Sequence, residues 1–70
     1  MYLEKFVANL NELFRESGVS NEKVANATGI SRSALGHWRT GVRQPKLEAV
    51  CALADYFDVS IDELVGRRDY

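Results

Sequence analysis

Three polar residues, Arg32, Ser33 and His37, lie close together in a segment that the sequence predicts to be a short helix. Ser33 and His37 are four positions apart, so they share one side of such a helix, with Arg32 beside them. An arginine guanidinium can pair bidentately with O6 and N7 of guanine, and a hydroxyl or an imidazole can hydrogen-bond to other base edges. The three side chains therefore suit direct contact with the edges of base pairs.

Simpler roles remain open to each of these residues. Arg32 can contact a phosphate or stay a solvated surface charge. Ser33 can contact a phosphate or satisfy backbone groups of its own helix. His37 can contact a phosphate when protonated, or be an exposed residue without a contact. As the single histidine of the chain, it is a poor candidate for a metal ligand or a general base.

The rest of the composition argues against an active site. The chain has 70 residues, one histidine and one cysteine, Cys51, and no glycine-rich phosphate loop. A nucleophile with its base, a metal-ligand set and an internal disulfide all need more residues of these types. We therefore expect no enzymatic activity, no cofactor and no bound metal.

Charge is distributed unevenly along the chain, although the formal net charge is only −1. Residues 20–46 contain five basic residues and one acid, so they carry +4 and leave −5 for the remainder. The five basic residues are Lys23, Arg32, Arg39, Arg43 and Lys46. Such an asymmetry would steer one face of the domain toward a polyanion; ordinary surface charge is the alternative.

The spacing of apolar residues predicts helices throughout and no strands. The expected helices cover residues 2–16, 21–27, 32–39, 47–57 and 61–65. Ser20, Ser31 and Ser60 stand at N-cap positions. Leu47 is expected on the buried face of the fourth helix, and Ile61 on that of the fifth. We therefore expect an all-α fold, a compact bundle of five short helices over residues 1–66, with residues 67–70 as a flexible tail.

The second and third helices form a recognisable pair over residues 21–38. Ala25 would allow the two helices to approach closely, and Gly29 would make the turn through a positive φ, so bulk should be poorly tolerated at both. Trp38 fits a core position better than a stacking platform for single-stranded bases. The residues expected to hold the motif together are Ala25, Gly29, Ile30, Leu35 and Trp38. This arrangement is that of a helix-turn-helix, in which the second helix enters a duplex major groove.

With its residues laid out in this way, the chain resembles the lambda-repressor-like family, also called the Cro/C1 or XRE-type helix-turn-helix domains. The resemblance covers most of the chain and depends on the joint spacing of several short motifs. They are Val19-Ser20-Asn21, Val24-Ala25, Thr28-Gly29-Ile30-Ser31, Trp38, Gly41, Arg43, Pro45, Leu47 and Val59-Ser60-Ile61-Asp62-Glu63-Leu64. The resemblance implies a sequence-specific transcriptional regulator of bacterial or phage type, commonly dimeric on near-palindromic operators.

Two positions depart from the family pattern. The family often has glutamine at the start of the second helix, where this chain has the shorter Asn21. It commonly has an acidic residue after the tryptophan, where this chain has Arg39. The second change adds positive charge near the groove.

Residues around the helix pair are expected to hold the sugar-phosphate backbone and set the register of the domain on DNA. These predicted phosphate contacts are Asn21, Lys23, Arg39, Arg43 and Lys46. If four of the five basic residues neutralise phosphates, the logarithm of affinity should fall with the logarithm of salt concentration at a slope of about −3.6 per subunit.

The functional expectation is therefore a regulator, and more specifically a repressor, that binds double-stranded DNA as a homodimer. The alternative is a protein-interaction module, such as an antitoxin or antirepressor, whose acidic helices contact a protein partner. No stretch of 18 apolar residues and no secretion signal occur in the sequence, and the single cysteine fits a reducing compartment. We therefore expect a cytoplasmic location and no association with membranes.

Overall fold

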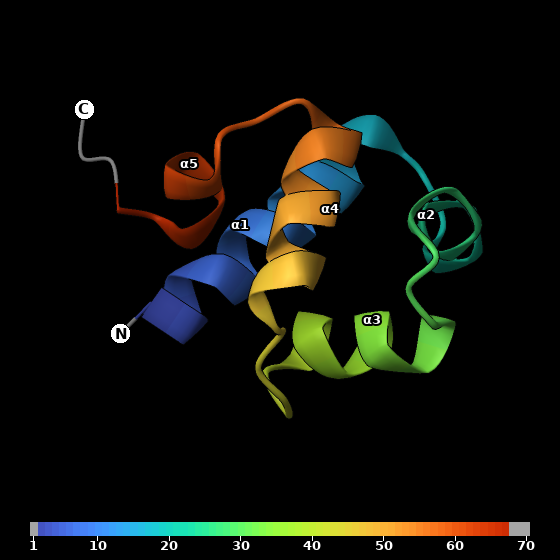
Figure 1. Cartoon of the computed structure of the whole chain (residues 1–70), viewed down its shortest axis with the longest axis horizontal. Helices are drawn as coiled ribbons and strands as arrows, with labels where there is room; N and C mark the ends of the chain where they lie inside the picture. Colours follow the sequence, from blue (N-terminus) through green and yellow to red (C-terminus); the bar gives the residue numbers. More distant parts are fainter. Residues whose placement is uncertain (1, 68–70) are drawn as a thin grey trace.

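The computed structural model describes residues 2–67, and within that range the regular secondary structure consists of α-helices joined by short turns and loops. The five helices are α1 (Tyr2–Ser17), α2 (Asn21–Thr28), α3 (Arg32–Thr40), α4 (Leu47–Phe57) and α5 (Ile61–Val65). Each begins and ends within about one residue of its predicted position, so the predicted all-α fold is confirmed. Figure 1 shows α3 along the lower edge of the molecule, with α2 beside its first turn and α5 at the far side of α1.

Serine side chains define where three of the helices begin. Ser20 Oγ accepts a hydrogen bond from the amide of Lys23, and Ser31 Oγ accepts one from the amide of Ala34, both at 3.1 Å. Each bond satisfies an amide that has no partner within its own helix. At α5 the cap is reciprocal, since Glu63 also accepts from the Ser60 amide at 3.1 Å. This capping box was not predicted, and it stabilises a helix of only five residues.

The core draws on all five helices. Its buried residues are Phe6, Leu10, Phe14, Val24, Ala25, Leu35, Trp38, Val50, Leu53, Ala54 and Leu64. The predicted inward positions of Ala25, Leu35 and Trp38 are therefore confirmed, and Ile30 packs against this cluster half-buried. Because α3 is anchored through Leu35 and Trp38, its opposite side is left for contact with other molecules.

Contacts between the helices fix α2 and α3 on the rest of the domain. The first helix packs against α3 and α5, whereas α2 packs against α3 and α4. Asn9 on α1 donates to the carbonyl oxygens of Glu63 and Leu64 at 3.1 Å each, so α5 is held by hydrogen bonds as well as by Leu64. The helix pair is therefore supported from two sides.

Two residues predicted to be buried lie at the surface instead. Leu47 is 72% exposed, because it is the first residue of α4 and the buried face of that helix begins one turn later, at Val50. Ile61 is 38% exposed, because it is the first residue of the short α5, whose buried anchor is Leu64. Apolar spacing located the correct helix faces but not the points at which the core ends.

The positive φ predicted for Gly29 is confirmed, but the expected lack of room for a larger side chain is not. A Cβ atom built on Gly29 would meet nothing within 4 Å, so lack of space does not restrict this position. Its φ is +79°, in the left-handed region, and its amide donates to the carbonyl of Ala25 at 2.9 Å. The turn between α2 and α3 therefore needs glycine for its backbone conformation.

The predicted tail lies mostly outside the described residues, which end at Arg67. The Arg67 amide donates to the carbonyl of Asp62 at 2.8 Å, directly after Gly66 ends α5. Within residues 2–67, no helix has both the length and the apolar character needed to cross a membrane.

Candidate nucleic-acid interface

The outer side of α3 carries the three residues predicted to contact bases. Arg32 and Ser33 are exposed and His37 is half-buried, whereas Leu35 and Trp38 of the same helix are buried in the core. Gly36 lies on the same outer side, and a Cβ built there would meet nothing within 4 Å. This side of α3 is therefore polar and unobstructed in the free protein.

An open hollow runs between α3 and the loop that leads to α4. Ser33 and His37 line it from α3, Trp38 contributes to its wall, and Arg43 and Lys46 line it from the loop side. Glu48, from the first turn of α4, is the acidic residue on its lining. The hollow thus brings two of the predicted base-contacting residues next to two of the predicted phosphate contacts.

A second hollow lies on the other side of α3, against the first turn of α2. Its lining includes Asn21, Glu22, Arg32 and Arg39. Arg32 Nη1 donates to Glu22 Oε1 at 2.9 Å, and both side chains are 66% exposed. An ion pair this exposed contributes little to stability, so the Arg32 guanidinium can exchange this partner for another acceptor.

Arg39 is engaged inside the protein. Its Nε donates to Oδ1 of Asn11 and its Nη1 to Oδ1 of Asn21, both at 2.7 Å. Its Cζ lies 4.1 Å from the centre of the Phe14 ring, a cation–π contact. Arg39 thereby links the end of α3 to α1 and to the first turn of α2.

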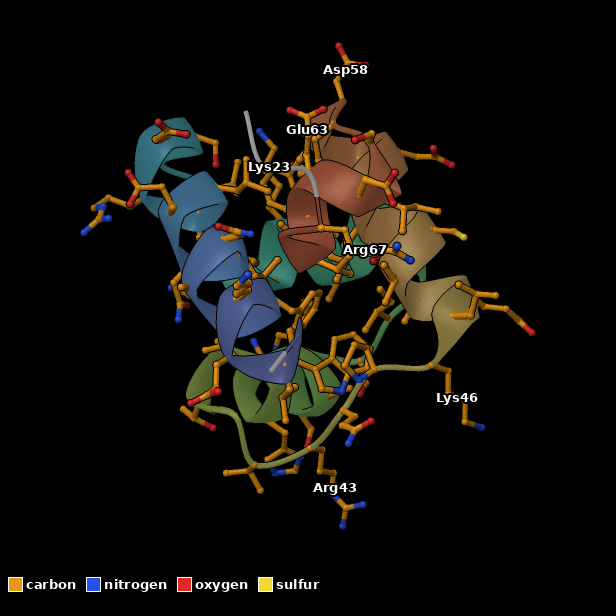
Figure 2. All side chains as sticks on the ribbon, turned by 90° about the vertical axis from the view of Figure 1, so that its left-hand side faces the viewer. Lys23, Arg43, Lys46, Asp58, Glu63 and Arg67 are labelled. Atoms are coloured by element: carbon orange, nitrogen blue, oxygen red, sulfur yellow. The ribbon has the colours of Figure 1, made fainter. Side chains whose placement is uncertain are left out.

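Figure 2 labels four basic and two acidic side chains, whose heights can be related to Figure 1 because the two views share the vertical direction. Arg43 points down from the edge of the molecule that carries α3, and Lys46 lies toward the same end. Asp58 and Glu63 lie at the upper end, and Lys23 lies at their level. Among the labelled residues, Arg43 and Lys46 therefore mark a basic end, and Lys23 lies away from it.

The predicted site residues consequently fall into two groups. The structure gathers six of them around the outer side of α3. They are Asn21, Arg32, Ser33, His37, Arg43 and Lys46. It places Lys23 away from this surface, and it commits the Arg39 guanidinium to hydrogen bonds within the protein.

Sequence reasoning missed two residues that touch the site. Asn11 was not singled out, although it borders the apolar stripe of α1 three positions before Phe14, where a polar side chain can face a neighbouring helix. The sequence shows Glu22 only as one acidic residue among basic ones, because its pairing with Arg32 depends on how α2 crosses α3. Among residues 2–67, no group of three or more histidine, cysteine or acidic side chains is placed to hold a metal ion.

Comparison with known proteins identifies the motif. The family model described as helix-turn-helix matches residues 10–64 of the chain. The HTH-type transcriptional regulator AnsR of Bacillus subtilis is 41% identical over 59 residues, which cover 84% of this chain and 51% of that protein. No solved structure matches the chain significantly.

Two further relatives carry names of the same kind. The cryptic phage CTXphi transcriptional repressor RstR of Vibrio cholerae is 35% identical over 91% of this chain and 58% of its own length. The HTH-type transcriptional activator BcrR of Enterococcus faecalis is 30% identical over 93% of this chain and 32% of its own length. The chain thus spans between about a third and three fifths of these relatives, whose names do not favour the antitoxin alternative. From its matched motif and its helix pair, the chain belongs to the XRE-type helix-turn-helix family.

Proposed function

We propose that this chain is a sequence-specific, double-stranded DNA-binding transcriptional regulator that inserts α3 into the major groove. One observation carries the proposal: α3 is fixed to the core through Leu35 and Trp38, while its outer side presents Arg32, Ser33 and His37 to solvent. A helix held in this way can meet base edges without reorganising the domain. The named functions of the relatives support the same conclusion.

The residues divide into two roles in this proposal. Arg32, Ser33 and His37 contact base edges, because they lie on the outer side of α3. Asn21, Arg43 and Lys46 contact phosphates on the two flanks of α3, where they line the two hollows. Lys23 and Arg39 take no part in phosphate binding, because Lys23 lies at the other end of the molecule and Arg39 has internal partners.

The regulator acts, in our proposal, as a homodimer on a near-palindromic operator. A single module of this size buries less surface than specific DNA binding commonly requires, and twofold symmetry doubles that surface. We further propose that it represses transcription in the cytoplasm by occupying the operator. Occupancy alone can block a polymerase, and the relative RstR is named a repressor.

The dependence of DNA affinity on salt tests this assignment of charges. Two phosphate-contacting cations, Arg43 and Lys46, give an expected slope of log affinity against log salt near −1.8 per subunit. If Arg32 also contacts a phosphate, the slope should be about −2.7 per subunit. If four of the five basic residues contact phosphates, it should be about −3.6. Fluorescence anisotropy with a short labelled duplex over a series of salt concentrations measures the slope.

Single substitutions then show which residues contribute to the dependence of affinity on salt. Arg43→Gln is expected to make it shallower by about 0.9, whereas Lys23→Gln is expected to leave it unchanged. A slope near zero for the wild-type protein would rule out duplex binding through this face. If Lys23→Gln makes the slope shallower by as much as Arg43→Gln does, the DNA-binding surface is not the one assigned here around α3.

A further inference from the structure

The hydrogen bonds of Arg39 determine how Asn21 faces the solvent. A side-chain amide has an acceptor end and a donor end, whereas a guanidinium has only donors. Arg39 Nη1 lies 2.7 Å from the Asn21 side chain, so the amide must turn its oxygen, Oδ1, toward Arg39. The NH₂ group, Nδ2, is then the end that this bond leaves for another partner.

Asn21 occupies a place at which a donor is useful. It is the first residue of α2, directly after the cap Ser20, and it lines the hollow that also contains Arg32. Phosphate oxygens are acceptors only, and they pair with donors such as an amide NH₂. If the amide were reversed, Oδ1 would face the phosphate and repel it.

Arg39 is itself held firmly enough to impose this orientation. Its Nε donates to Oδ1 of Asn11 at 2.7 Å, and Asn11 Nδ2 donates back to the Arg39 carbonyl at 2.9 Å. The guanidinium also lies over the ring of Phe14, which is 3% exposed. Asn11, Asn21 and Arg39 are all half-buried, so their hydrogen bonds are shielded in part from competing water.

We propose that Arg39 is a positioning residue: it fixes the Asn21 amide so that Nδ2 donates to a DNA phosphate, and it contributes no phosphate contact of its own. The inference rests on the proposed function, because it concerns how the same face binds a duplex. It predicts that Asn21 and Arg39 act on DNA affinity as one unit. The acidic residue that the family pattern has after the tryptophan would instead accept from Nδ2 and turn the amide over.

A double-mutant cycle tests the coupling. Affinity for a short mixed-sequence duplex at low salt is measured for the wild type, Asn21→Ala, Arg39→Met and the double variant, at a temperature well below the unfolding midpoint of each. Asn21→Ala is expected to weaken binding about tenfold when Arg39 is present, as for a hydrogen bond to a charged group, and less than about twofold in the Arg39→Met background. Asn26→Ala, the same change at an exposed position of α2, is the matched control and should have no effect.

Asn21→Asp tests whether position 21 must offer a donor to the phosphate if Arg39→Met does not fold. An aspartate can still pair with Arg39, so the unfolding midpoint should be retained, but it offers no donor to a phosphate. We expect its affinity to fall at least as far as that of Asn21→Ala. Equal effects of Asn21→Ala in both backgrounds, or wild-type affinity in Asn21→Asp, would overturn the inference while leaving DNA binding intact. A wild-type protein that binds no duplex would instead overturn the proposed function.

Discussion

Replacing Trp38 with alanine is expected to reduce the free energy of unfolding by about 3–5 kcal/mol. Trp38 is 8% exposed, belongs to the core cluster, and anchors the last turn of α3. Removing the indole leaves a cavity between helices that the surrounding backbone can close only in part. Small domains commonly have an unfolding free energy of only about 5–15 kcal/mol, so this loss removes a large share of the stability and should lower the urea midpoint accordingly.

Urea denaturation followed by helical circular dichroism measures this loss without relying on the fluorescence of the removed residue. Val42→Ala is the matched control, because Val42 is 67% exposed in the loop after α3 and its truncation should change stability by less than about 0.5 kcal/mol. A Trp38→Ala variant with wild-type stability but no affinity for nucleic acid would contradict the core assignment and would favour a stacking role.

Replacing Arg32 with alanine is expected to remove about 1–3 kcal/mol of discrimination at one base pair of the preferred site. The guanidinium lies on the outer side of α3 and forms an exposed ion pair with Glu22. Arg32→Lys keeps the positive charge but replaces the planar fork of donors with a single flexible ammonium, so it should lose most of the same discrimination. Competition between the preferred duplex and single-base variants of it measures this difference.

Arg15→Ala is the matched control for this experiment. Arg15 is also an exposed arginine paired with a glutamate, Glu12, but it lies on α1. Its removal should change neither affinity nor discrimination. If Arg32→Ala weakens binding equally for all sequences and Arg32→Lys restores it, Arg32 contacts a phosphate. If neither variant changes binding, Arg32 is a solvated charge.

The positions of the helices could be predicted from local sequence because their signals are local. Serine caps at residues 20, 31 and 60, glycines after α2, α3 and α5, and apolar residues at helical spacing define each helix independently of the others. The outer side of α3 could be predicted for the same reason, since Leu35 and Trp38 determine which side is buried.

The remaining features depend on how helices are placed relative to one another. Arg39 was predicted to contact a phosphate because its charge lies near the motif, but its partners Asn11 and Asn21 come from two other helices. Lys23 follows Asn21 by two positions on α2 and therefore lies on another side of that helix. The net charge of residues 20–46 thus indicated that basic residues gather near α3. It did not indicate which of these residues lie on the surface there.

Selection of binders from a random library of duplexes, followed by sequencing, tests most directly whether α3 recognises a DNA sequence. The measurement needs no knowledge of the natural operator, and the sample is first shown to be folded by circular dichroism. We predict enrichment of a near-palindrome whose half-sites are about 10 base pairs apart, as two symmetric copies of this motif require. The selection is repeated with Arg32→Ala for comparison. If the folded wild-type protein enriches no sequence, and its selected pool is the same as that of Arg32→Ala, the account is contradicted.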